Sequence, residues 1–97
     1  MGVYMVGVLV ENRKEQAVKV QEILTEYSDK IVCRHGCPYP NRQSGLITLL
    51  CEATSEEVDS LVSKLQSLPG IKAKAMELEV PAGLKVLSTA TVFPKQF

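Results

Sequence analysis

The pattern of hydrophobic and polar positions predicts four strands. Residues 3–10 and 46–51 are apolar almost without interruption and too short for helices, which predicts strands covered on both faces. Residues 31–37 and 71–80 predict two further strands. The last of these carries lysines on one face and glutamates on the other, which is typical of an edge strand.

Two segments between these strands show helical periodicity. Asn12 with Glu15 and Thr54 with Glu57 match the capping-box pattern, so a helix is expected to begin after each pair. Apolar residues then recur at spacings of three and four, which forms one apolar stripe on each helix. The stripes are Ala17, Val20, Ile23, Leu24 and Tyr27 in the first helix, and Val58, Leu61, Val62, Leu65 and Leu68 in the second.

The order of these elements, βαββαβ, predicts an α+β domain of ferredoxin-like fold over residues 1–80. Right-handed crossovers give a four-stranded antiparallel sheet of order 4-1-3-2, with both helices on one face. That order puts the first and third strands in the centre of the sheet. These are the two strands whose sequences are apolar on both faces, so pattern and topology agree.

The face of the sheet without helices is expected to be broadly apolar. Soluble monomers rarely expose a large apolar patch. We therefore expect the chain to form a homo-oligomer, a dimer or a tetramer, through its sheet faces.

Residues 81–97 form a C-terminal extension beyond the four-strand unit. Residues 86–93 carry no charge and have high β propensity. Two interpretations stay open, an additional strand in this sheet or a partner's, or a disordered segment.

Charge, hydropathy and cysteine content narrow the expected partners and the expected cellular compartment of the chain. The 97 residues hold 11 basic and 11 acidic side chains, a formal net charge of zero, whereas a nucleic-acid-binding domain usually has a basic excess. We expect no direct nucleic-acid binding by this chain alone and no membrane association, since no apolar run reaches about 18 residues. Without a signal-peptide pattern, three cysteines fit reduced thiols in a cytoplasmic protein.

Three segments resemble a known family. They are Val-Gly-Val-Leu-Val-Glu-Asn-Arg at 6–13, Val-Cys-Arg-His-Gly-Cys-Pro-Tyr at 32–39 and Leu-Pro-Gly-Ile at 68–71. Over residues 3–79 the chain resembles the iron-only hydrogenase system regulator family, whose members resemble ACT domains and the C-terminal ligand-binding domain of the nickel-responsive repressor. The resemblance implies an ACT-like fold and a bacterial, cytoplasmic, oligomeric regulator linked to hydrogenase expression or maturation.

The same resemblance limits the expected mechanism. The nickel-responsive repressor binds metal mainly through histidines, and this chain has one histidine. The nickel-responsive repressor also carries a separate DNA-binding segment, and nothing before Val3 in this chain resembles such a segment. A role as transcriptional regulator therefore implies a partner protein.

Cys33, His35 and Cys37 are candidate metal ligands. Side chains alternate along a strand, so all three point the same way, at successive spacings of about 6.5 to 7 Å. A bend at Gly36 or Pro38 would bring them together, and thiolates with an imidazole suit zinc or iron. In the other interpretation the cysteines are apolar filler and the histidine is a surface residue. A site completed by a second chain is a further form of the metal hypothesis.

Four residues are candidates for an anionic ligand. Asn12 and Arg13 lie at the start of a predicted helix, where backbone N–H groups favour anions, and the ACT-like resemblance implies effector binding near this turn. Arg34 and Arg42 flank a proline-rich connection and could contact the same ligand. The alternative is a capping asparagine and ordinary surface arginines.

Three functions remain in order of preference. The first is a regulatory, ligand-sensing domain that oligomerises and binds a small-molecule or metal effector. The second is an assembly or maturation factor for a hydrogenase metallocluster that uses Cys33 and Cys37. An enzyme comes last, because no base–nucleophile pair or phosphate-binding loop stands out in the sequence.

Overall fold

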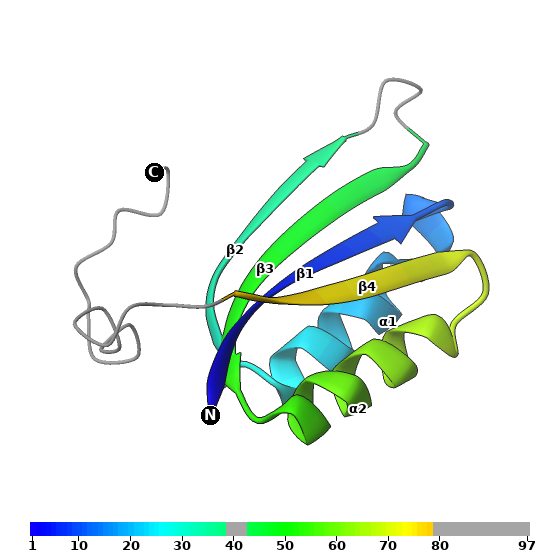
Figure 1. The fold of residues 1–97 in the computed structure, drawn as a ribbon. Coiled ribbons are helices and arrows are strands. Elements are labelled where there is room, and N and C mark those ends of the chain that lie inside the picture. The colour runs from blue at the N-terminus through cyan, green and yellow to red at the C-terminus, as the bar shows by residue number, and fades with distance from the viewer. Residues whose placement is uncertain (39–42, 79–97) are drawn as a thin grey trace.

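The computed structural model describes residues 1–38 and 43–78 (Figure 1). The predicted extension 81–97, the end of the predicted fourth strand and Arg42 lie outside the described residues. The elements follow the predicted βαββαβ order: β1 (Gly2–Val10), α1 (Arg13–Glu26), β2 (Ile31–Pro38), β3 (Gly45–Ala53), α2 (Ser55–Gln66) and β4 (Ile71–Leu78).

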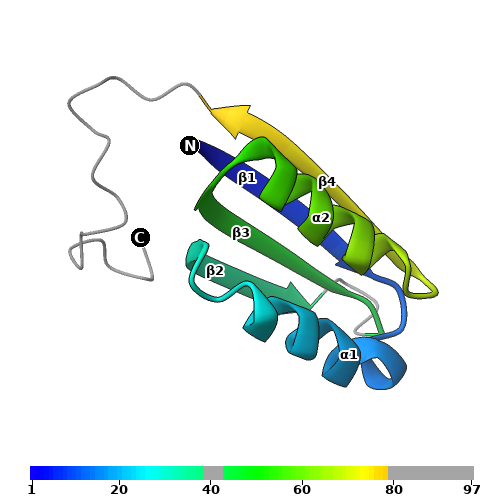
Figure 2. The ribbon, with the colours of Figure 1, turned by 90° about the horizontal axis from the view of Figure 1, so that it is seen from below.

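The four strands form one antiparallel sheet in the order β2-β3-β1-β4, which confirms the predicted order. Both helices cover the same face, and α2 packs mainly on β4 and β1 (Figures 1 and 2). The central strands are the two with continuous apolar sequences. Their sequences therefore put apolar side chains on both faces in the middle of the sheet, the face under the helices and the face without them.

The core lies between the sheet and the helices. Every second residue of β1 from Tyr4 to Val10 faces the helices, as does every second residue of β3 from Leu49 to Ala53. α2 contributes the predicted stripe, in which Leu65 is completely buried. Cys51 of β3 is 1% exposed and belongs to this core.

The inward face of α1 confirms four residues of the predicted stripe, Val20, Ile23, Leu24 and Tyr27, and differs from it at one turn. The buried positions are Gln16, Val20 and Leu24, four residues apart, and Ala17 is exposed. The reason is that α1 packs chiefly on α2 and β1, which turns position 16 toward the core and position 17 toward the space in front of β2 and β3. Periodicity predicts that a helix has an apolar side, but the packing partner fixes its rotation.

Both predicted helix starts are confirmed. Asn12 Oδ1 accepts a hydrogen bond from the backbone N–H of Glu15 at 3.4 Å. At α2 the capping box is complete: Thr54 N–H donates to Glu57 Oε1 at 2.9 Å, and Glu57 N–H donates to Thr54 Oγ1 at 3.2 Å. The bond from Thr54 N–H, followed by the bond from Lys30, lowers the pKa of Glu57.

Contacts at its two ends hold α1 in place. At the C-terminal end, a 2.7 Å hydrogen bond joins Tyr27 Oη to Ser60 Oγ, and Lys64 Nζ lies 3.0 Å from Glu26 Oε2. At the other end, Arg13 N–H donates to the backbone oxygen of Gln43 at 2.9 Å. Between these anchors the helix lies away from β2. In the described part of the chain, neither helix is long and apolar enough to cross a membrane.

Candidate functional site

Two features of the fold are candidates for function, one on each side of the sheet. The first is the helix-free face, formed by the residues of each strand that point away from α1 and α2. The strand registers put these apolar residues on it: Val3, Met5, Leu9, Leu46, Leu50, Met76, Leu78, Cys33 and Cys37. Met5 is 38% and Met76 59% exposed, and the leucines are half-buried. The predicted apolar face is therefore present on the described strands.

One position at the centre of this face has no side chain. Gly7 lies on β1 between Thr48 of β3 and Lys74 of β4. A Cβ at this position would meet no atom within 4 Å. The middle of the face therefore lacks a side chain where another surface could approach closely.

The three candidate metal ligands lie on the helix-free face. Cys33, His35 and Cys37 pair with Leu50, Thr48 and Leu46 of β3. The register of β2 shifts between Ile31 and Cys33, but from Cys33 to Pro38 the strand pairs continuously with β3, without a break that would gather the three side chains. Four residues along a strand span about 13 Å, so Cys33 and Cys37 are too far apart for a disulfide within one chain. Within residues 1–38 and 43–78, no group of three His, Cys, Asp or Glu side chains is arranged to hold a metal.

The three thiols differ in their surroundings. All are free, with Cys37 exposed, Cys33 half-buried and Cys51 buried. Burial, together with the nearby Cys33, raises the pKa of the Cys51 thiol to about 11. Cys51 therefore stays protonated and inert near neutral pH, and any thiol chemistry would fall to the two cysteines of β2.

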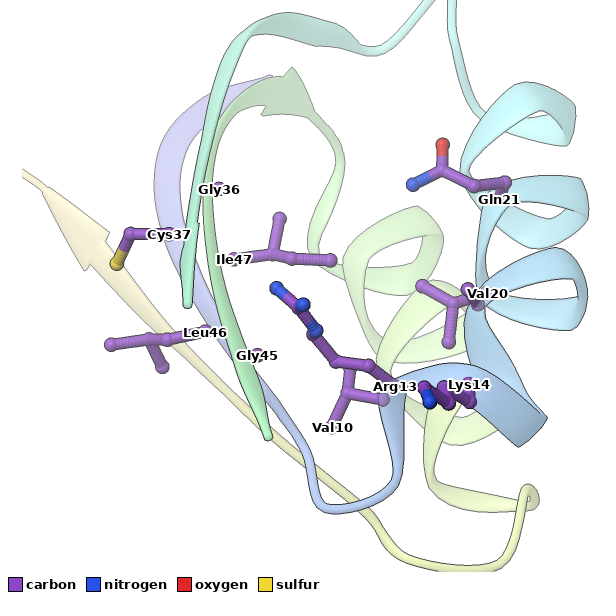
Figure 3. Close-up of a pocket in the computed structure, with 11 residues that line it drawn as sticks. Val10, Arg13, Lys14, Val20, Gln21, Gly36, Cys37, Gly45, Leu46 and Ile47 are labelled. Atoms are coloured by element: carbon purple, nitrogen blue, oxygen red, sulfur yellow. The ribbon is translucent and has the colours of Figure 1, made fainter. Parts of the chain in front are cut away.

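The second feature is a cavity of about 460 Å³ between α1 and the strands β2 and β3 (Figure 3). The cavity is lined by the last residue of β1, the N-terminal half of α1, the C-terminal end of β2 and the N-terminal end of β3. The lining residues are Val10, Arg13, Lys14, Ala17, Val20, Gln21, Gly36, Cys37, Gly45, Leu46 and Ile47. Figure 3 shows the side chains of Cys37 and Leu46 pointing away from the cavity, toward the helix-free face.

The predicted anion-binding residues have separate places around this cavity. Asn12 caps α1, and Arg13 lines the cavity. Arg34 extends from β2 to α1, where its Nη2 donates to Gln21 Oε1 at 2.7 Å. Gln21 lines the cavity, so Arg34 is one residue removed from it. The structure thus brings Arg13 and Arg34 to the same cavity, and Arg42 lies outside the described residues.

Sequence reasoning missed the other polar lining residues. Lys14 and Gln21 fit the polar side of an amphipathic helix, where side chains are ordinarily solvated. They line a cavity because α1 stands away from β2, and no local pattern encodes that distance. The small residues Gly36 and Gly45 are the available signal, because a strand glycine often marks a close approach or an open space.

Hydrogen bonds from three segments fix the connection between β1 and α1. Ser44 Oγ donates to the backbone oxygen of Glu11 at 3.1 Å. Glu11 N–H in turn donates to the backbone oxygen of Gly70 at 2.9 Å. Gly70 has a φ of 72°, a left-handed conformation that suits glycine in this turn. The start of α1, and with it Arg13, is thereby held against β3 and the turn before β4.

Comparisons with solved structures support this fold. The TM1266 protein of Thermotoga maritima, whose structure was solved as an uncharacterized protein, superposes with a TM-score of 0.76 at 26% identity. The match covers 80% of this chain and 98% of that protein. An unknown protein from Galdieria sulphuraria has a TM-score of 0.61 at 15% identity, over 84% of this chain and 47% of the other.

A third structure shares the fold alone. A formyltetrahydrofolate deformylase from Pseudomonas putida KT2440 has a TM-score of 0.54 at 10% identity, over 76% of this chain and 28% of the enzyme. No curated protein matches the chain in sequence. The sequence does match a family over residues 2–75, a range that contains all of β1 through α2 and most of β4. The chain therefore belongs to the TM1266-like family, which is described as an iron-only hydrogenase system regulator.

Proposed function

We propose that this chain is a regulatory module of the iron-only hydrogenase system that associates with a second copy of itself through the helix-free face. The observation that carries the proposal is the apolar surface on the central strands β1 and β3, opposite the helices. Burying such a surface removes apolar area from water, which stabilises an oligomer at roughly 25 cal/mol per Å² before the costs of association.

A second copy of the chain suits this face better than a charged partner does. The chain has a formal net charge of zero, so long-range repulsion does not oppose self-association. Gly7 at the centre would let two sheets approach closely. Lys72 and Lys74 lie on the edge strand β4, where they remain at the rim of a contact centred on β1 and β3.

The regulatory part of the proposal rests on the family to which the chain belongs. Equal numbers of basic and acidic residues give little basis for holding nucleic acid directly. We therefore propose that the module acts by binding another protein, which supplies the contact with DNA or with the hydrogenase machinery.

Analytical ultracentrifugation of the full chain, with the variants Gly7→Glu and Gln66→Glu, tests the association. Gly7→Glu places a carboxylate at the centre of the face, next to Lys74 across the strands, so the folded monomer is preserved. Gln66→Glu adds the same charge on the exposed side of α2. We expect the wild-type chain and Gln66→Glu to be dimers or tetramers and Gly7→Glu to be a folded monomer. A monomeric wild-type chain would overturn the proposal.

The position of two thiols supports a second candidate function, assembly of a hydrogenase metallocluster. Cys33 and Cys37 are free and lie on the helix-free face of the edge strand β2. In an assembly factor, Cys33→Ser and Cys37→Ser would abolish hydrogenase maturation in cells while association persists. In a regulator that does not use the thiols, both variants would leave maturation intact.

A further inference from the structure

We propose that the cavity between α1 and strands β2 and β3 binds a small molecule with an anionic head and an apolar body. The cavity lies on the side of the sheet that the helices cover, opposite the helix-free face. That this molecule regulates the protein rests on the proposed function, whereas its binding depends on the cavity alone.

Hydrogen-bond donors dominate the polar lining of the cavity. Arg13 and Lys14 are cationic and have no acceptor capacity, and no Asp or Glu is among the described residues that line the cavity. The described residues offer neither side chain an ion-pair partner. A lining of unpaired donors suits a carboxylate or a phosphate. It disfavours a zwitterion, whose ammonium group would find no carboxylate here.

Arg34 orients a third donor, the amide of Gln21. A guanidinium only donates hydrogen bonds, so the Gln21 atom that it contacts at 2.7 Å must be the oxygen. The amide nitrogen is therefore on the other side of the group. Figure 3 shows that nitrogen on the side that faces Ile47 and the cavity. Arg34 is thus a positioning residue that makes Gln21 a donor toward the ligand.

The direction of Arg13 is also set by its surroundings. Its backbone N–H is bonded to Gln43, and the stem of its side chain passes directly over Gly45. In Figure 3 the guanidinium points from the start of α1 toward Ile47, into the space between β3 and the helix. An anionic head held there would lie between Arg13 and the amide of Gln21.

The remaining lining accommodates an apolar body. Val10 and Val20 are buried at the floor, and Ile47 and Ala17 line the walls. At Gly36 a Cβ would approach no atom closer than 4.0 Å, the distance to Ile47, so β2 leaves room for a ligand. A volume of about 460 Å³ falls within the usual range for sites of small organic ligands.

Calorimetric titration of the full chain with sodium hexanoate tests the inference. We expect saturable binding, with amide NMR shifts at Arg13, Gln21 and Ile47. Arg13→Gln removes the positively charged guanidinium group and should weaken hexanoate binding by about tenfold or more. Lys19→Gln is the control, because it removes a charge from the same helix without lining the cavity, and affinity should stay within about twofold.

Three further ligands test the anionic head and the apolar body of the proposed ligand one at a time. Acetate lacks the apolar body and hexanol lacks the charge, so each should bind more weakly than hexanoate by about tenfold or more. Hexyl phosphate carries the other anionic head, and its affinity relative to hexanoate identifies which head the site prefers. Hexanol that binds as tightly as hexanoate, or hexanoate that fails to bind, would overturn the inference.

Gly36→Leu tests the role of the cavity volume without changing the charged residues that line the cavity. The leucine would occupy the cavity, so hexanoate binding should be lost while the thermal unfolding temperature is maintained. The same titration on the Gly7→Glu variant separates the two proposals. Hexanoate should still bind to this monomeric variant, because the cavity lies on the other side of the sheet. A monomeric wild-type chain that binds hexanoate would overturn the proposed function only, and an oligomeric wild-type chain that does not bind hexanoate would overturn this inference only.

Discussion

Arg13 lies across Gly45, and the two residues fit only because Gly45 has no side chain. A Cβ at Gly45 would lie 2.8 Å from Cδ and 3.1 Å from Cγ of Arg13, closer than carbon atoms ordinarily approach. Gly45 begins β3 and Arg13 begins α1, so the contact joins a strand to a helix far from it in sequence. It is also the contact that directs the Arg13 guanidinium into the cavity.

Gly45→Ala should therefore displace Arg13 and weaken hexanoate binding by about tenfold, the scale of a lost charged contact. The fold should tolerate the change, within about 1 kcal/mol in the free energy of unfolding, because a flexible side chain yields and alanine suits a strand no worse than glycine. Calorimetry and urea unfolding measure the two quantities. Gly7→Ala is the matched control, since it adds a methyl group to β1 where nothing lies within 4 Å. An equal loss of affinity in both variants would contradict the role given to Gly45.

Leu65→Ala should reduce the free energy of unfolding by about 2 to 5 kcal/mol, because it leaves a cavity at a completely buried position of α2. Urea unfolding followed by circular dichroism checks the value. Val18→Ala removes apolar atoms from a helical position that is 69% exposed, and its effect should stay within about 0.5 kcal/mol. Similar effects of the two substitutions would contradict the described core.

Thr54→Ala removes one half of the capping box of α2 and should lower the free energy of unfolding by about 1 kcal/mol. Gln66→Ala, near the exposed end of the same helix, is the control and should have little effect. If both variants unfold at the same urea concentration as the wild-type chain, the cap makes no contribution to stability.

The contribution of Glu57 to the stability of the fold should also depend on pH. The pKa of Glu57 is lowered from its usual 4.5, first by the bond from Thr54 N–H and then by Lys30. Stability from an acid with a lowered folded pKa is complete above the unfolded value and is lost as the pH falls through the folded value. The stability difference between the wild-type chain and Glu57→Gln should therefore hold at neutral pH and shrink below 4.5. Unfolding curves across this range test it, and a difference that grows in acid would contradict it.

Thiol reactivity should separate the cysteines. In the Gly7→Glu variant, iodoacetamide at about pH 8 should alkylate Cys37 readily, because the thiol is exposed. Cys51 should remain unmodified, since it is 1% exposed and its pKa is about 11. Peptide mass spectrometry of timed samples follows each site, and all three cysteines should react in denaturant. Early modification of Cys51 in the native chain would show that β3 is less well packed than described.

The elements and their order were predictable because their signals are local. Alternation and continuity of apolar residues indicated the strands, and Asn12 and Thr54 marked the helix starts. Central positions for β1 and β3 followed from the ferredoxin-like strand order, and their continuous apolar sequences agreed with it. The family was also recognisable from short segments in β1, β2 and the turn after α2.

The rotation of α1 and the cavity were decided by tertiary structure. Gln16 is buried and Ala17 is exposed because α1 packs against α2 and β1 and stands away from β2. The pairing of Arg34 with Gln21 and the contact of Arg13 with Gly45 join residues from different elements. Hydrophobic periodicity reports which side of a helix is apolar, but not how far its polar side stands from a neighbouring strand. That distance depends on how whole elements pack, which is why the sequence indicated Arg13 and Arg34 but not the cavity beside them.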